Sequence, residues 1–314
     1  MRVGAVDCGT NSIRLLISEV GAAGQLSDIC REMRVVRLGE GVDATGRFAD
    51  AAIERTRRAL ADYVDLMLAQ GVSAVRMVAT SATRDAANRD DFFAMTAELL
   101  GRVVPGAVAE VISGDEEARL SFAGAVGELA PDGGPFVVVD LGGGSTEFVL
   151  GDHDGVTAAK SVNIGCVRLT ERCLHSDPPT DSEIAAAQSV IAEAVAEATS
   201  QVPVHQARSW VGVAGTMTTL SAVGQGLDEY DPARIHLSRI DIDELSQVCW
   251  RMVRMTRAER AALGPMHPGR IDVIGGGSLV TLAIVELMRA GGVNELIVSE
   301  HDILDGIAMS LLGP

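Results

Sequence analysis

One strand–turn–strand pattern occurs twice in this chain. In residues 136–150 an apolar run ends at Asp140, a glycine-rich turn follows, and a second apolar run begins at Phe148. Residues 3–17 repeat the pattern around Asp7. With the two aspartates aligned, three further pairs coincide: Gly9 with Gly142, Ser12 with Ser145 and Arg14 with Glu147. A single copy fits an ordinary hairpin turn equally well, but two copies in register predict a duplicated fold.

The two turns are suited to binding phosphate. Glycine has no Cβ, so backbone N–H groups in such a turn can approach an anion closely. We therefore predict phosphate-binding loops, with the two aspartates supporting a divalent metal that accompanies the phosphate. The metal-supporting residues predicted from the pattern are Asp7 and Asp140. The phosphate-binding residues predicted are Gly9, Thr10, Asn11, Ser12, Gly142, Gly143, Gly144 and Ser145, with Arg14 as a phosphate ligand or as the partner of a strand neighbour.

Charge and cysteine content limit the function further. The 314 residues carry a net charge of −17, which argues against nucleic acid as a partner because duplex binding needs a basic face. Five cysteines without a CxxC pair favour neither a disulfide framework nor a zinc site, and indicate a reducing cytoplasm. The start of the chain reads as a strand and not as a signal peptide, and no apolar segment is long enough to span a bilayer.

Each half of the chain is expected to form a mixed sheet: three antiparallel strands, then alternating helices and parallel strands. The predicted lobes comprise residues 1–125 with 300–314, and residues 126–299, with a cleft between them. The strands predicted are 3–8, 13–20, 29–38, 75–79, 108–112, 155–163, 210–214 and 295–299, and residues 136–151 are predicted as the second hairpin. The helices predicted are 50–70, 90–101 with Asp90 as its cap, 113–129, 165–174, 181–200, 241–254, 257–263, 279–289 and 302–312. The turn at 142–144 leads into a strand, which excludes a Rossmann site.

Several other stretches are candidates for chemistry. Thr80–Arg84 is predicted as a loop at the ligand-binding end of a strand, or as a simple turn with a solvent-exposed arginine. Glu116 and Glu117 begin a helix that Ser113 caps, and side chains of adjacent helical residues point about 100° apart, so only one can face inward as a base for water. The alternative is that both merely favour the helix N-terminus.

Three weaker features are predicted to be structural. The glycines at 215 and 275–277 fit close helix–sheet packing or contact with a nucleotide, and we favour packing. His301-Asp302 has no partner histidine nearby in the sequence and is predicted to be a loop before the last helix. Cys8 is predicted to be a core residue and not a nucleophile.

These motifs together resemble the exopolyphosphatase/guanosine pentaphosphate phosphohydrolase family. The resemblance covers almost the whole chain and implies the duplicated, ribonuclease H-like α/β fold of actin, Hsp70 and sugar kinases, with two lobes. The stretches that carry it are 7–14, 80–84, 113–119, 140–147, 165–169, 212–219 and 270–275. The elements Ser113-Gly-Asp-Glu-Glu-Ala118 and Thr80-Ser-Ala-Thr-Arg84 are the most specific to this family.

The resemblance implies Mg²⁺-dependent release of terminal phosphate from inorganic polyphosphate, or alternatively from guanosine pentaphosphate. Glu117 matches the family's catalytic base, Arg84 its motif arginine, and Asp140 and Glu147 its metal-supporting carboxylates; Mn²⁺ is the alternative metal. Longer members add an HD-type domain that this sequence lacks, which favours short chains. A homodimer is also implied. The rival functions are a small-molecule kinase of the same superfamily and a non-catalytic nucleotide sensor.

Overall fold

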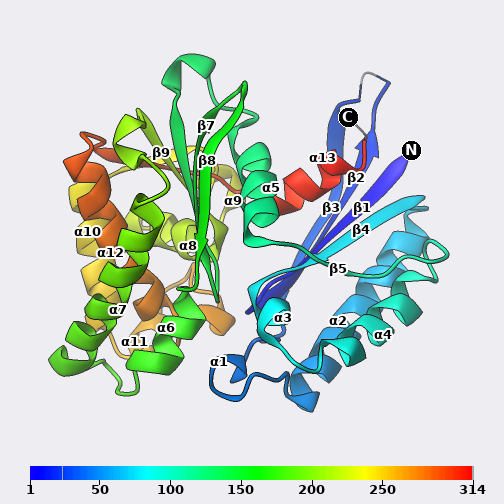
Figure 1. The fold of residues 1–314 in the computed structure, drawn as a ribbon, viewed down its shortest axis with the longest axis horizontal. Coiled ribbons are helices and arrows are strands. Elements are labelled where there is room, and N and C mark those ends of the chain that lie inside the picture. Colours follow the sequence, from blue (N-terminus) through cyan, green and yellow to red (C-terminus); the bar gives the residue numbers. More distant parts are fainter. Residues whose placement is uncertain (23, 313–314) are drawn as a thin grey trace. The chain divides into compact units, whose positions relative to one another are not determined.

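The computed structural model describes residues 1–22 and 24–312. The chain divides into two compact units. The first comprises Met1–Gly124 and the segment that starts at Ile303, and the second comprises Ala125–Asp302 (Figure 1). The chain thus passes between the units twice, once within a helix at Gly124 and once after Asp302.

In the described part of the chain, the first unit holds a five-stranded sheet in the order β3-β2-β1-β4-β5. Its strands are β1 (Arg2–Cys8), β2 (Ser12–Val20), β3 (Leu26–Val35), β4 (Ala74–Ala79) and β5 (Glu110–Val111). β1, β2 and β3 pair antiparallel, whereas β4 and β5 run parallel to β1. The predicted order of three antiparallel strands followed by parallel strands is therefore confirmed.

Alternate residues of these strands enter two different cores, as the two-residue period of a strand requires. Val6 and Leu15 pack with α2 and α4, whereas Ala5 and Leu16 pack with α13. Figure 1 shows α2 and α4 on one face of this sheet and α13 on the other. The helices of the first unit are α1 (Val42–Thr45), α2 (Asp50–Ala69), α3 (Ser81–Asp85), α4 (Arg89–Leu100), α5 (Gly114–Val126) and α13 (Ile303–Ser310).

The second unit repeats the design with a larger sheet, in the order β10-β11-β9-β6-β7-β8. Its strands are β6 (Phe136–Leu141), β7 (Thr146–Asp152), β8 (Gly155–Val162), β9 (Ser209–Val213), β10 (Ser238–Asp241) and β11 (Glu295–Val298). β6, β7 and β8 pair antiparallel, and β9 and β11 continue the sheet in parallel with β6. The duplicated α/β fold predicted from the two turns is thus confirmed.

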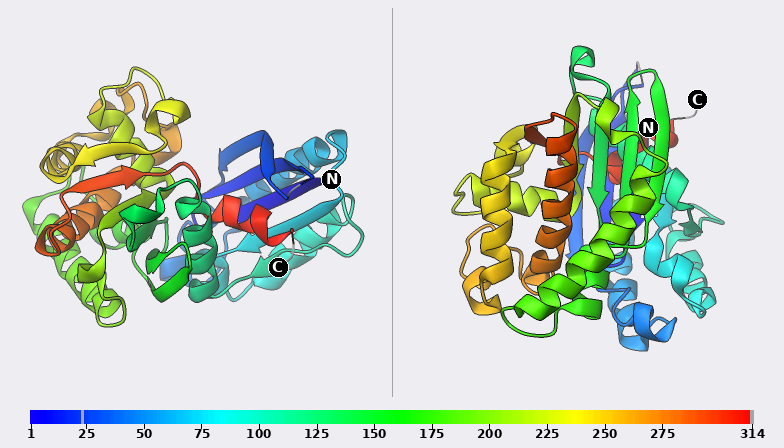
Figure 2. Two further views of the ribbon diagram at one scale, coloured as in Figure 1. Left: turned by 90° about the horizontal axis from the view of Figure 1, so that it is seen from above. Right: turned by 60° about the vertical axis from the view of Figure 1, so that its left-hand side comes forward.

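The helices of the second unit share one large apolar core with its sheet. Helix α12 packs against α6, α7 and α10, and Figure 2 shows α7, α10 and α12 side by side. The helices are α6 (Cys166–Cys173), α7 (Asp181–Thr199), α8 (Ala214–Gly224), α9 (Pro232–Ile235), α10 (Ile242–Arg254), α11 (Arg257–Ala261) and α12 (Ile274–Ala290), with short 3-10 turns η1 (Pro131–Gly133), η2 (Val204–Gln206) and η3 (Pro268–Arg270). Of the helices described, none is sufficiently long and apolar to cross a membrane.

The structure corrects several predicted elements. Residues 81–85 and 274–277, predicted as non-helical, are helical, because tertiary packing overrides the low helix propensity of their glycines, serine and threonines. Ala214, predicted as the last residue of a strand, is instead the first residue of helix α8. Strand β10 was missed because four residues give too short a pattern. Asp90 is not the cap of α4, since the residue before that helix is Asn88.

Helix α7 begins with a capping box that gives the fold a pH dependence. The Glu183 carboxylate accepts hydrogen bonds from the backbone N–H groups of His175, Ser176 and Thr180, and these lower the pKa of Glu183 from 4.5 to about 2, with the Thr180 bond contributing most. A lowered pKa in the folded state means that the charged carboxylate stabilises the fold above about pH 4.5 and loses that effect as the pH falls toward 2.

We expect Glu183→Gln to melt at a lower temperature than the native chain at pH 5–7, with the difference shrinking as the pH approaches 2. Thermal melts by circular dichroism over that range would measure it. Glu193→Gln, at an exposed position of the same helix, is the matched control. A difference that stayed constant with pH would contradict the role of the Glu183 charge.

Candidate active site

Loop 1, residues 9–12, accepts hydrogen bonds from residues 36–39, which follow β3. Gly9 N–H donates to Ser12 O at 3.0 Å and closes the turn. Gly39 N–H then donates to Thr10 O, and the N–H groups of Val36 and Arg37 both donate to Asn11 O. The loop carbonyls therefore point into the protein, which leaves the other side of the turn to backbone amides and suits an anion. The sequence analysis had assigned no role to residues 36–39.

Loop 2, residues 142–145, is built in the same way in the second unit. Gly142 N–H donates to Ser145 O at 3.1 Å. The first N–H groups of α6, from Cys166, Val167 and Arg168, donate to the carbonyls of Gly142 and Gly143. The Arg168 side chain adds a hydrogen bond from Nε to Gly144 O at 2.8 Å.

Gly165, the residue before α6, must be a glycine because α6 lies close to loop 2. A Cβ on Gly165 would lie only 2.4 Å from the carbonyl carbon and oxygen of Gly143, so the close approach of α6 to loop 2 requires the absence of a side chain. Gly165 and Arg168 lie in a stretch that carried the family resemblance, but the sequence alone gave neither a role. Their contacts join residues distant in sequence, which no local pattern reveals.

Each loop joins two strands on which charged residues lie directly opposite one another. In the second unit Asp140 faces Glu147 across β6 and β7. Directly opposite residues project from the same face of the sheet with Cβ atoms about 5 Å apart. Both side chains are buried, at 7% and 1% exposure, and Glu147 Oε1 accepts a hydrogen bond from Ser161 Oγ at 2.6 Å. Two buried carboxylates this close are a donor set that fits a divalent cation with oxygen ligands.

The equivalent pair in the first unit is an ion pair. Asp7 faces Arg14 across β1 and β2, and Arg14 donates to Asp7 Oδ2 from Nε at 3.0 Å and from Nη2 at 2.7 Å. Arg14 thus pairs with a strand neighbour, one of the two roles expected for it. The predictions that Asp7 supports a metal and that Arg14 binds phosphate stay predictions. The duplicated hairpins therefore differ in their side chains: the first pairs a carboxylate with a guanidinium, and the second places two carboxylates opposite one another.

The two glutamates at the start of α5 point in different directions. Glu117 is 7% exposed, and its Oε2 accepts a hydrogen bond from Arg84 Nη1 at 2.7 Å. Glu116 is half-buried and pairs instead with Arg76 at 2.6 Å. Ser113 Oγ accepts from Glu116 N–H, as the predicted cap requires. Of the two alternatives, only Glu117 has the inward orientation expected of a base.

Arg84 lies on the short helix α3 and holds Glu117 in place. Besides the carboxylate, it donates to Ile112 O at 3.0 Å from the same Nη1 atom. Thr80, just before α3, donates its N–H to Cys8 O at the end of β1. Loop 1, Thr80–Arg84 and Glu117 thus follow the carboxyl ends of the parallel strands β1, β4 and β5, the edge where α/β sheets bind ligands.

Gly215, Gly276 and Cys8 are structural, as predicted. A Cβ on Gly215 would meet the Arg270 guanidinium at 2.4 Å, and one on Gly276 would meet Thr170 Oγ1 at 2.5 Å, so these glycines allow close packing. Cys8 is buried, and burial raises the pKa of its thiol, which keeps it from acting as a nucleophile.

The chain is similar to known phosphatases over nearly its whole length. The model of the Ppx/GppA phosphatase family matches residues 16–313. The chain is 62% identical over 316 residues to exopolyphosphatase 2 of Mycobacterium tuberculosis, covering 99% of both chains. Its structure is similar to a crystal structure of an exopolyphosphatase-like protein, with a TM-score of 0.92, 41% identity and 98% of each chain covered. A Ppx/GppA enzyme of Aquifex aeolicus gives a TM-score of 0.80 at 31% identity, over 99% of each chain.

Proposed function

Since this chain belongs to the Ppx/GppA phosphatase family, we propose that it is an exopolyphosphatase that releases terminal orthophosphate from inorganic polyphosphate, with short chains preferred. The high identity to a full-length relative named exopolyphosphatase supports this substrate. The observation that carries the reaction is the buried Glu117 carboxylate held by Arg84, next to the end of the sheet where loop 1 lies.

The metal we propose is Mg²⁺, with Mn²⁺ as the alternative. Phosphatases of this family generally depend on a divalent metal. Asp140 and Glu147 would hold it, because the two buried carboxylates lie opposite one another on paired strands and Mg²⁺ prefers oxygen ligands. Bound there, the metal would offset charge on the phosphate oxygens.

The protein groups have separable roles in the proposed reaction. Glu117 accepts a proton from the attacking water, and Arg84 orients the Glu117 carboxylate through its 2.7 Å hydrogen bond. The amides of loops 1 and 2 stabilise negative charge on the transferred phosphoryl group. Thr10 supports ligand binding at loop 1, since its hydroxyl is buried and has no hydrogen-bond partner among the described residues.

We propose that the enzyme lies in the cytoplasm. The five cysteines are all free thiols, which fits the proposed cytoplasmic location. A homodimer stays a prediction from the resemblance.

A panel of substrates tests the proposed function. We expect the purified chain with Mg²⁺ to release phosphate fastest from short polyphosphate, more slowly from long polyphosphate and guanosine pentaphosphate, and least from ATP, without any phosphate acceptor. Free phosphate measured in a coupled colorimetric assay would rank the four. Fastest release from guanosine pentaphosphate would instead identify the nucleotide as the substrate, and a requirement for an acceptor would indicate a kinase.

A further inference from the structure

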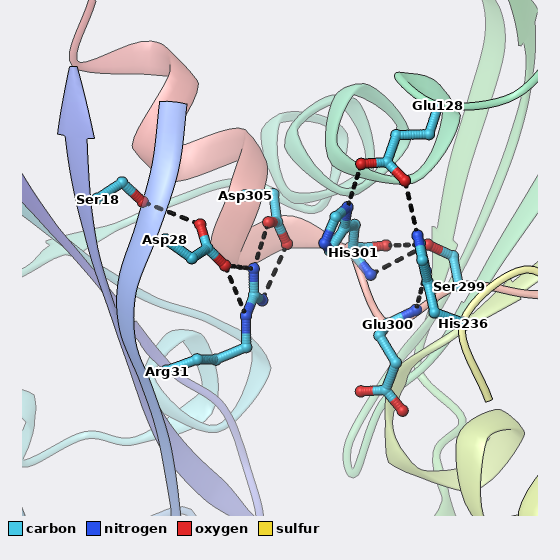
Figure 3. Close-up of polar contacts among 9 residues, drawn as sticks. All are labelled: Ser18, Asp28, Arg31, Glu128, His236, Ser299, Glu300, His301 and Asp305. Carbon is cyan, nitrogen blue, oxygen red and sulfur yellow. Dashed lines mark hydrogen bonds and ion pairs between the residues drawn. The ribbon is translucent and has the colours of Figure 1, made fainter. Parts of the chain in front are cut away.

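A second group of metal-binding side chains lies in the second unit, formed by Glu128, His236 and His301 (Figure 3). The Glu128 carboxylate faces both imidazoles: Oε2 lies 2.8 Å from His236 Nε2, and Oε1 lies 3.6 Å from His301 Nδ1. The two rings lie against one another with centroids 4.4 Å apart. His301 thus has a partner histidine, His236, 65 positions earlier in the chain, which the sequence pattern does not predict.

The donor atoms suit a transition metal. Two imidazole nitrogens and one carboxylate oxygen form a set that Zn²⁺, Co²⁺ and Ni²⁺ prefer, whereas Mg²⁺ prefers oxygen alone. One ligand atom from each residue lies within 4.8 Å of the others. Ligands at bond lengths of about 2.0–2.2 Å lie closer together than this, so binding needs only small side-chain rotations. We propose that Glu128, His236 and His301 form a binding site for a transition-metal dication, separate from the Asp140–Glu147 pair.

Solvent can reach the three ligands, and two of them have fixed surroundings. The side chains of His236 and His301 are 21% and 31% exposed, and that of Glu128 is 56% exposed. The backbone at His301 is fixed by Ser299, whose buried hydroxyl donates to His301 O and accepts from His301 N–H. The three protein ligands would fill three coordination positions of the metal, and water from the surface can fill the others.

The second nitrogen of His236 couples metal binding to the backbone. His236 Nδ1 accepts a hydrogen bond from Glu300 N–H at 3.2 Å, so the ring in this structure carries its proton on Nε2. A metal at Nε2 takes the place of that proton, and the neutral ring must then carry a proton on Nδ1. The hydrogen bond from Glu300 N–H to His236 Nδ1 is then lost. Metal binding therefore removes this link between His236 and the segment that joins β11 to α13.

Two of the three ligands lie beside the connections of the chain between its two units. Glu128 follows the first passage of the chain between the units, and His301 immediately precedes the second. Metal binding therefore joins both connecting segments to His236, which lies at the end of α9.

Cobalt titration of the full chain tests the site. In excess Mg²⁺, which occupies oxygen-ligand sites, we expect one Co²⁺ per chain with visible absorption typical of nitrogen ligation. His236→Ala and His301→Ala should each weaken Co²⁺ binding more than about tenfold, because loss of a direct ligand costs at least as much as loss of its outer partner. His205→Ala, at an exposed histidine outside the group, should bind Co²⁺ as the native chain does.

Hydrogen exchange gives an independent readout. The Glu300 amide should exchange faster in the Co²⁺-bound native chain than in the metal-free chain, and its exchange in His301→Ala should not respond to Co²⁺. Thermal melts without Co²⁺ establish that the variants are folded. Equal Co²⁺ affinity and spectra in the native chain and in both histidine variants would overturn the site.

Discussion

Replacing Glu117 by glutamine should reduce the turnover of polyphosphate by about 10²- to 10⁴-fold, the contribution of a positioned general base. Glutamine has nearly the same shape and keeps an oxygen that can accept the hydrogen bond from Arg84. The variant loses only the ability to take a proton from water. Initial rates over a range of substrate concentrations should therefore show kcat falling while KM changes little.

Glu116 provides the matched control for this experiment. It is the neighbouring residue of the same helix turn, and its carboxylate pairs with Arg76, whereas Glu117 pairs with Arg84. Glu116→Gln should keep near-native turnover, because it leaves the ion pair between Arg84 and Glu117 intact. Comparable losses in both variants would indicate a general effect on α5, and native turnover in Glu117→Gln would remove this residue as the base.

The duplicated fold was predictable because its signals are local and occur twice. Each hairpin carries apolar runs on both sides of a glycine turn, and the parallel strands that follow are short apolar runs. The errors fell where packing decides the structure. Gly275 to Gly277 interrupt the helical pattern in the sequence, yet they are helical because α12 packs there against Cys166, Thr170 and Thr216.

The candidate site was predictable only in part, for a related reason. The residues at the ends of strands follow from the motif, and helix geometry already indicated that one glutamate of the pair at 116 and 117 faces inward. Partners brought from elsewhere in the chain did not follow. Arg168 against loop 2, residues 36–39 behind loop 1 and His236 beside His301 are all contacts between distant segments.

Neutralising one carboxylate of the Asp140–Glu147 pair should abolish metal binding and activity together. In Glu147→Gln the side chain keeps its shape and an oxygen that can accept from Ser161, but the charge that attracts the cation is gone. If the native chain is stabilised by Mg²⁺ at 100 times its Kd, the gain is about 2.7 kcal/mol. Thermal melts with and without Mg²⁺ should show that rise in the native chain and none in the variant.

The metal-free Glu147→Gln chain provides the sharper test. A metal-binding role and a purely structural role of Glu147 predict opposite effects of this substitution on stability. Like charges on two neighbouring side chains repel, and the hydrogen bond from Ser161 to Glu147 offsets part of this. Removing one charge should therefore raise the stability of the metal-free chain, by about 1 kcal/mol. A residue kept for the fold alone would lower stability when changed. A metal-free Glu147→Gln chain that melts below the native chain, and still gains stability from Mg²⁺, would contradict the assignment of this pair as the metal site.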